Sequence, residues 1–331
     1  MQSSAQIAAS TFRQISETER GERARRAAAG ALVLACVERA RAGQADEFSL
    51  RRARHEVQGL EKSPEASILD RLLLLVESGS PSEPRLARAL VSYACELERT
   101  RRLPEANAAV GLALALDGTG SATALHAARL ARKLGERERA LALYCAAREL
   151  DGGSGSIARL AQVGEAVVSP EPVRALGRAI RRALQVGDAE AAAVGLEERA
   201  AARRAAGDRA GAARDLVIAA TRFTDAVDRA RVAHELAGVT LAMGDTAAAA
   251  QALQVALAWG SAPQQDHART RLHTLARDVG DQVGMRRWRS FKRPPLVSMS
   301  AYRPAPAEKS AAPRLLRWRE ALGHAADAKA S

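Results

Sequence analysis

The amino-acid sequence predicts an all-α fold built from repeated pairs of antiparallel helices, and three observations lead to this prediction. Hydrophobic residues make up 47% of the 331 residues, but aromatic residues only 3%. Apolar content that is mostly Ala, Leu and Val favours close helix–helix packing over a β-sheet core. Similar turn sequences recur at intervals of 34 to 38 residues. After most turns, apolar residues follow at spacings of four and then three, which places them on one helix face.

Most of the recurring turns combine a glycine with an acidic residue directly or shortly after it. A glycine can adopt the left-handed conformation that ends one helix, and an Asp or Glu can cap the next one. Two of the turns, at Arg101 and Ser169, use proline in place of glycine. The copies begin at Gly43, Arg101, Gly135, Ser169, Gly207, Gly244 and Gly280.

The helix after each turn carries an Ala, a larger apolar residue four positions on, and a second Ala three positions later. Ala140, Tyr144 and Ala147 illustrate the pattern, and it recurs at 106–113, 212–219 and 249–256. This pattern resembles the second helix of the tetratricopeptide repeat. The resemblance covers roughly residues 27–290 and is strongest in 87–152, although the first helices lack the family's Trp and Tyr. It implies a right-handed α-solenoid of six to seven helix pairs that acts by binding protein partners.

The helices expected in chain order follow from these turns. A shorter helix at 65–77 stands apart, and the Gly-rich stretch 151–156 is expected to be a loop between helices. We divide the chain into an N-terminal helical or flexible segment (1–26), the solenoid (27–292) and a Pro-rich basic tail (293–331) with a short helix at 313–328. The predicted pairs are 27–60, 84–116, 121–150, 155–186, 189–222, 226–259 and 263–290.

Catalytic and metal-binding motifs are absent from the sequence. It contains no HExxH, GxSxG or GxxxxGK[ST] pattern, and its Gly-rich stretches lack the Lys of a phosphate-binding loop. His267 and His273 are six positions apart, so they fall on different faces of a helix and make poor joint metal ligands. We therefore expect no enzyme activity, no catalytic residue, no metal site and no cofactor.

The family resemblance assigns the concave groove to the first helix of each pair, where solenoid proteins usually bind their partners. Basic residues at these positions predict a groove for an acidic peptide or acidic protein surface, because arginine forks match carboxylates. The alternative is that they form solvated helix faces in an arginine-rich chain. Glu98 and Glu197 also occupy groove positions. The basic groove candidates are Arg88, Arg99, Arg129, Arg132, Lys133, Arg204, Arg231 and His234.

A second candidate site is the basic and aromatic stretch near the C-terminus. Residues 281–331 contain eleven Lys or Arg against four Asp or Glu, so most of the net charge of +12 lies there. Interleaved cations and rings are typical of proteins that bind single-stranded nucleic acid, so a nucleic-acid-associated or regulatory role for 286–319 is the alternative function. The competing interpretation is that Trp288 and Phe291 cover the end of the last repeat. The patch comprises Arg286, Arg287, Trp288, Arg289, Phe291, Lys292 and Arg293.

Composition favours a cytoplasmic bacterial protein. The chain has three widely spaced cysteines, which is typical of a reducing compartment. No apolar run approaches the ~20 residues of a membrane-spanning helix. The sequence "VLAC" before Cys36 resembles a lipoprotein cleavage site, so a lipid anchor at Cys36 is the weaker alternative. The sequence determines neither the oligomeric state nor the identity of the partner.

Overall fold

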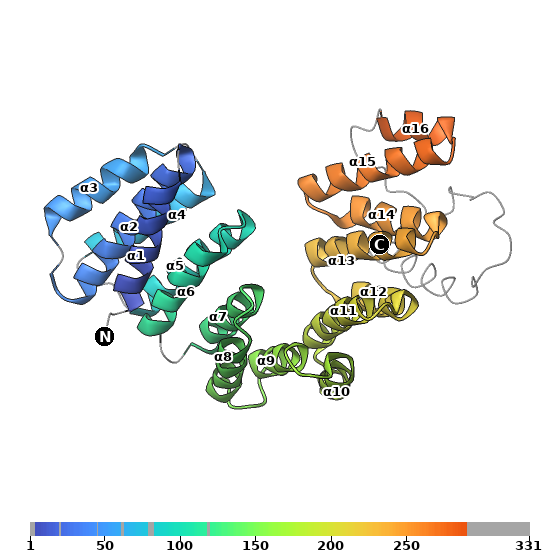
Figure 1. The fold of residues 1–331 in the computed structure, drawn as a ribbon, viewed down its shortest axis with the longest axis horizontal. Coiled ribbons are helices and arrows are strands. Elements are labelled where there is room, and N and C mark those ends of the chain that lie inside the picture. The colour runs from blue at the N-terminus through green and yellow to red at the C-terminus, as the bar shows by residue number, and fades with distance from the viewer. Residues whose placement is uncertain are drawn as a thin grey trace, which may run out of the picture. The chain divides into compact units, whose positions relative to one another are not determined.

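A computed structural model describes residues 4–289, apart from residues 20, 45, 61–62, 79–82 and 118–119. Throughout these residues the regular structure is α-helical, with 16 helices packed in sequence as antiparallel pairs (Figure 1). This arrangement confirms the predicted all-α fold of antiparallel helix pairs; the right-handed solenoid of the tetratricopeptide type stays a prediction. The tail from residue 290 onward, including Phe291, Lys292, Arg293 and the helix predicted at 313–328, lies outside the described residues.

The chain forms two compact units, residues 1–168 and 169–331. The prediction of a single solenoid from 27 to 292 is not tested and stays a prediction. The first unit contains α1 (Ser4–Thr18), α2 (Glu22–Arg41), α3 (Glu47–Gln58), α4 (Pro64–Glu77), α5 (Glu83–Arg99), α6 (Leu103–Leu116), α7 (Ser121–Lys133), α8 (Arg137–Leu150) and α9 (Ser156–Val167). The second contains α10 (Pro172–Gln185), α11 (Ala189–Ala205), α12 (Arg209–Arg222), α13 (Ala226–Ala242), α14 (Thr246–Trp259), α15 (Ala262–Asp278) and α16 (Gln282–Arg289).

The observed helices match most of the predicted pairs, with differences at the N-terminus and at 155–186. The helices of the predicted pair 155–186, α9 and α10, belong to different units, and α10 packs against α11 instead. The predicted pair 27–60 corresponds to α2 and α3, but α2 packs more extensively against α1 than against α3. Residues 4–18 therefore form a helix that pairs with α2. Its Phe12 is fully buried and stacks on Tyr93 of α5, with ring centroids 5.9 Å apart.

The recurring turns work as the sequence predicted, except where glutamate takes the capping position. Gly207 and Gly244 have φ of 83° and 80°, and the Asp after each accepts a hydrogen bond from the backbone N–H three residues on, at 2.8 and 2.9 Å. Glu136 makes no such bond and pairs with Arg139 at 2.7 Å instead. At one of the two turns without glycine, Arg101 itself takes a φ of 62°.

The predicted packing face is buried throughout. Ala140, Tyr144 and Ala147 are essentially inaccessible, and so are their counterparts in α6, α12 and α14. Tyr144 packs its ring against Gly164 of α9, where an added Cβ would overlap the ring. Close packing of this kind depends on residues without a side chain at the contact.

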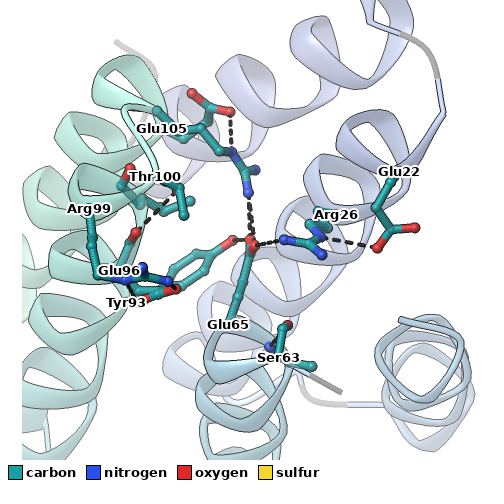
Figure 2. Close-up of polar contacts among 12 residues, drawn as sticks. Glu22, Arg26, Ser63, Glu65, Tyr93, Glu96, Arg99, Thr100 and Glu105 are labelled. Carbon is teal, nitrogen blue, oxygen red and sulfur yellow. Dashed lines mark hydrogen bonds and ion pairs between the residues drawn. The ribbon is translucent and has the colours of Figure 1, made fainter. Parts of the chain in front are cut away.

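A buried ionic cluster joins four helices of the first unit (Figure 2). Arg102, at the start of α6, donates from Nη1 to Glu65 of α4 at 2.7 and 2.9 Å, and from Nε to Glu105 at 2.8 Å. Tyr93 of α5 donates its hydroxyl to Glu65 at 3.2 Å, and Arg26 of α2 lies 3.9 Å from the same carboxylate. Burial raises the pKa of Tyr93 well above its ordinary value, so the hydroxyl keeps the proton that it donates. We call Arg102, Glu65, Glu105 and Tyr93 the Arg102 cluster.

The second unit has a smaller counterpart of the Arg102 cluster. Asp215 of α12 is only 2% exposed and accepts hydrogen bonds from Arg199 at 2.7 and 2.9 Å and from Arg203 at 2.8 Å, both on α11. A buried carboxylate is tolerated when cations and hydrogen bonds compensate its lost hydration. In each unit, therefore, charged residues help to hold a helix contact together.

Replacing Gly164 by Ala is expected to destabilise the first unit by about 1–3 kcal/mol, because the added methyl group collides with the buried ring of Tyr144. The matched control is Gly111→Ala in α6, where an added Cβ meets no neighbour. That change is expected to be neutral or to stabilise by about 0.5–1 kcal/mol. Hydrogen–deuterium exchange of α8 and α9 peptides measures the first effect. Equal exchange in both variants would contradict the close contact.

Arg102→Leu is expected to destabilise the first unit by about 3–5 kcal/mol, because it leaves Glu65 and Glu105 buried without their cation. Arg139→Leu is the control, since it breaks an exposed ion pair with the same three-residue spacing, at a cost of less than about 1 kcal/mol. Exchange of amides in α4, α5 and α6 reports the difference. A cost for Arg102→Leu no larger than that of the control would rule out the cluster as the anchor of this unit.

Candidate functional site

The structure distributes the eight predicted groove residues over four helices that are each the first of a pair. Five lie in the first unit and three in the second, so they do not form one described surface. Arg88 and Arg99 are on α5, and Arg129, Arg132 and Lys133 are on α7. Arg204 is on α11, and Arg231 and His234 are on α13.

In the first unit, groove positions of α5 and α7 face each other across the helix contact. Glu98 of α5 forms an ion pair with Lys133 of α7, and its Oε2 lies 3.8 Å from Nε2 of His126. The same Nε2 lies 3.9 Å from Sγ of Cys95. The family register gives groove positions to Cys95, Glu98 and Lys133 but does not single out His126. We call this surface the α5–α7 face.

The Cys95, His126 and Glu98 side chains do not form a catalytic triad. A triad needs the imidazole to contact the acid through one nitrogen and the nucleophile through the other, but both contacts here go to Nε2. Partial desolvation and the nearby Glu98 raise the pKa of the Cys95 thiol above its ordinary value, which favours the protonated form. Burial lowers the pKa of His126; Glu98 opposes this, and the cations Arg129 and Lys133 add to it.

Positive charge on the α5–α7 face is partly neutralised within the face. Arg99 donates to Glu96 at 2.8 and 2.6 Å, and Lys133 pairs with Glu98. Arg88 donates to the carbonyl of Pro84 on its own helix at 3.2 Å and keeps its charge. Since α7 carries three basic residues and no acidic one, α5 and α7 together carry more basic than acidic residues.

In the second unit, carboxylates neutralise the predicted groove residue Arg231. Arg231 forms ion pairs with Glu197 of α11 and with Asp228, the latter at 3.0 Å, and lies 4.0 Å from Glu235. Three carboxylates therefore surround one guanidinium group. Asp228 and Glu235 are on α13 itself, three positions before and four positions after Arg231, whereas Glu197 lies 34 positions before it and is contributed by α11.

His234 is held between α13 and α15 and is not a free binding group. Its Nε2 lies 3.1 Å from the carbonyl oxygen of Gln264, so this nitrogen is the protonated donor, and its ring lies 5.1 Å from that of His267. Burial lowers the pKa of His234; the bond to Gln264 opposes the shift, and His267 and Arg271 add to it. His234 therefore favours the neutral form in the folded protein.

The C-terminal patch is described only for its first four residues, on α16. Trp288 is 4% exposed, and its ring is not presented for stacking on a base. Burial of this ring agrees with the interpretation that it covers the end of the last helix pair. Arg286 and Arg289 are exposed, whereas the guanidinium of Arg287 lies 4.9 Å from the centre of the Trp288 ring.

Cys36, the candidate lipid-anchor residue, lies in the interior of α2 and is buried in the core. Burial, the largest influence, raises its pKa to about 11. Such a thiol is not presented to a modifying enzyme in the folded chain. None of the helices within the described ranges is long and apolar enough to cross a membrane. In the same part of the chain, no three side chains of the metal-binding types gather closely enough to hold an ion.

Two features that matter most were not singled out from the sequence. Arg102 is the centre of a buried cluster, but in the sequence it is only a polar residue of a turn. Helix α10 exposes four arginines, whose sequence signal was their one-sided helical spacing without any acidic residue. The spacing of these arginines is a local pattern in the sequence, whereas the burial of Arg102 depends on packing against α4.

Comparison with known proteins adds little to these observations. No family model and no curated protein matches the chain. Among solved structures, the chain is similar to the crystal structure of BtubC (BKLC) from P. vanneervenii, with 17% sequence identity over 93% of this chain and 94% of that one. The TM-score is 0.25. A likeness at this level carries no inference about function, so the class of this protein, an all-α protein of paired helices, rests on its own helices.

The second unit is expected to lose stability as the pH falls below about 6.5, the ordinary pKa of histidine. The unfolded chain binds the proton at that pH, whereas folded His234 binds it only at a lower pH, so acid favours unfolding. His234→Gln, which keeps a donor for the Gln264 carbonyl, should flatten this dependence. Urea unfolding at pH 7.5 and 5.5, followed by the fluorescence of Trp259 and Trp288, measures it.

The control for this experiment is His55→Gln, because His55 is exposed on α3 in the other unit. It should leave the pH dependence of the tryptophan signal unchanged. If His234→Gln keeps the full wild-type loss between the two pH values, the burial of this imidazole is not its source.

Proposed function

We propose that this protein is a non-enzymatic scaffold that binds an acidic segment of a protein partner on the α5–α7 face. The observation that carries the proposal is the charge of α7, which presents Arg129, Arg132 and Lys133 with no acidic residue of its own. Helices α5 and α7 together carry six basic and three acidic residues, so net positive charge lies where the first helices of two successive pairs meet, and Glu98 pairs with Lys133 there. Helix-pair repeats usually use this face to bind peptides.

The chemistry of the same face supports binding and not catalysis. The pKa of Cys95 is raised, Nε2 of His126 lies near both Cys95 and Glu98, and Glu98 pairs with Lys133. Arginines held on a rigid helix can form paired hydrogen bonds to carboxylates of a partner. The proposal places the function in the shape and charge of this surface.

Association through nucleic acid is the weaker alternative. Among the described residues of the C-terminal patch, the one ring that would stack on a base is buried. The exposed Arg286 and Arg289 leave an electrostatic contact with phosphates as the remaining support. Binding that disappears after nuclease treatment would therefore favour this alternative over a protein partner.

The α5–α7 proposal predicts that Arg129→Glu combined with Arg132→Glu weakens partner binding by about tenfold or more, because the acidic partner then meets like charge. Affinity capture on the immobilised full chain, with quantification of each captured protein by mass spectrometry, measures the effect. The matched control reverses two exposed arginines of α3, Arg51→Glu and Arg52→Glu, and should retain the partners. Survival of the same partners in both variants would contradict the assigned face.

A further inference from the structure

Helix α10 presents a one-sided arginine surface on the second unit. Its basic residues recur at positions i, i+4, i+7 and i+8, which confines them to a stripe about 100° wide. All four are exposed, and the helix contains no acidic residue. We call these residues the α10 stripe: Arg174, Arg178, Arg181 and Arg182.

The opposite side of α10 anchors the stripe to the body of the second unit. Leu176 and Ile180 are buried there together with four small residues, Ala175, Gly177, Ala179 and Ala183. This face packs against α11. The arginine backbones are therefore held on a rigid element, so a partner would meet them in a fixed arrangement.

The charges of the α10 stripe are not compensated within the second unit. Arg174 lies 3.4 Å from Glu171, but both side chains are at least 70% exposed, so water screens this pair. No carboxylate of the described residues forms an ion pair with Arg178, Arg181 or Arg182. The guanidinium groups of Arg181 and Arg199 both lie near Gly177, and Arg199 already pairs with Asp215.

Helix stability does not account for this arrangement. Like charges four residues apart on a helix repel each other, as in Arg174 with Arg178 and Arg178 with Arg182. A cation in the first turn, such as Arg174, also opposes the helix dipole. The stripe thus disfavours α10 by itself, and a bound anionic group would remove the repulsion.

Apolar surface at the end of the stripe indicates which anionic partner fits best. Leu184 and Val186 are 41% and 63% exposed. Single-stranded nucleic acid is bound largely through aromatic stacking, and α10 has no aromatic residue. Protein interfaces are enriched in Arg over Lys and combine charged rims with apolar contacts. The stripe has this composition.

We propose that the α10 stripe docks an acidic protein segment whose carboxylates are spaced one helical turn apart and whose apolar side chain meets Leu184 and Val186. Each guanidinium fork would pair with one carboxylate of the segment. This docking surface is separate from the α5–α7 face, lies on the other unit and does not depend on the function proposed there.

A designed peptide tests the α10 proposal. The probe is a fluorescein-labelled helical peptide with Glu at positions i, i+4, i+7 and i+8 and Leu near one end, compared with a scrambled peptide of the same composition. Fluorescence anisotropy with the full chain measures affinity near 0.15 M salt. The variants are Arg178→Glu with Arg182→Glu on α10, and the charge-matched control Arg214→Glu with Arg222→Glu on the exposed side of α12. Circular dichroism checks that each variant keeps its helices.

The wild type should bind the patterned peptide about tenfold more tightly than the scrambled one, and the α10 variant should lose about tenfold in affinity. The α12 control and the Arg129→Glu, Arg132→Glu variant should both bind as the wild type does. Equal binding of the two peptides, or equal loss in the α12 control, overturns the proposal.

Two further outcomes separate the alternatives. If only the Arg129→Glu, Arg132→Glu variant loses the peptide, the peptide occupies the α5–α7 face; the α10 proposal then fails and the proposed function stands. If the α10 variant loses binding to oligo-dT or to vesicles containing phosphatidylserine while the peptide does not bind, the stripe recognises phosphates, which also overturns the proposal.

Discussion

The buried guanidinium of Arg102 is the constraint on which the first unit depends. A buried charge is stable only when partners replace its lost hydration, and these come from two helices, Glu65 of α4 and Glu105 of α6. Tyr93 of α5 adds a hydrogen bond to the same carboxylate. Helix α4, which falls outside the repeat pattern, is thereby held in place by charge as well as by its apolar face. In the second unit the signs of the charges are reversed, because one buried carboxylate, that of Asp215, lies between two arginines.

The same rule of compensation decides which basic residues of this arginine-rich chain are available to a partner. Where the first helices of successive pairs meet, charged residues form ion pairs within the protein: Glu98 pairs with Lys133, and Glu197 pairs with Arg231. Positive charge remains only where one helix carries more cations than its neighbours can match, as on α7. Helix α10 is the extreme case, because its arginines face away from α11. Availability therefore depends on neighbours and not on the number of arginines.

Small residues at the helix contacts make both surfaces rigid. Alanine and glycine let helices approach closely, as where the ring of Tyr144 packs against Gly164. Large polar side chains are then displaced to the helix faces. A protein built in this way presents extended, fixed charge patterns, which suit the recognition of another protein chain.

The sequence by itself determined the all-α class, most helix boundaries and the buried face, because turns such as Gly207-Asp208 and spacings such as Ala212, Leu216 and Ala219 are local patterns. Through the repeat register it also named Glu98, Lys133 and Arg231 as groove positions. It left their ion-pair partners undetermined and the role of Trp288 open between two interpretations. Only tertiary structure decided these, along with the burial of Arg102. The physical reason is that pairing and burial of a charged or aromatic side chain depend on residues about one repeat away, whose distance and orientation are set by helix packing.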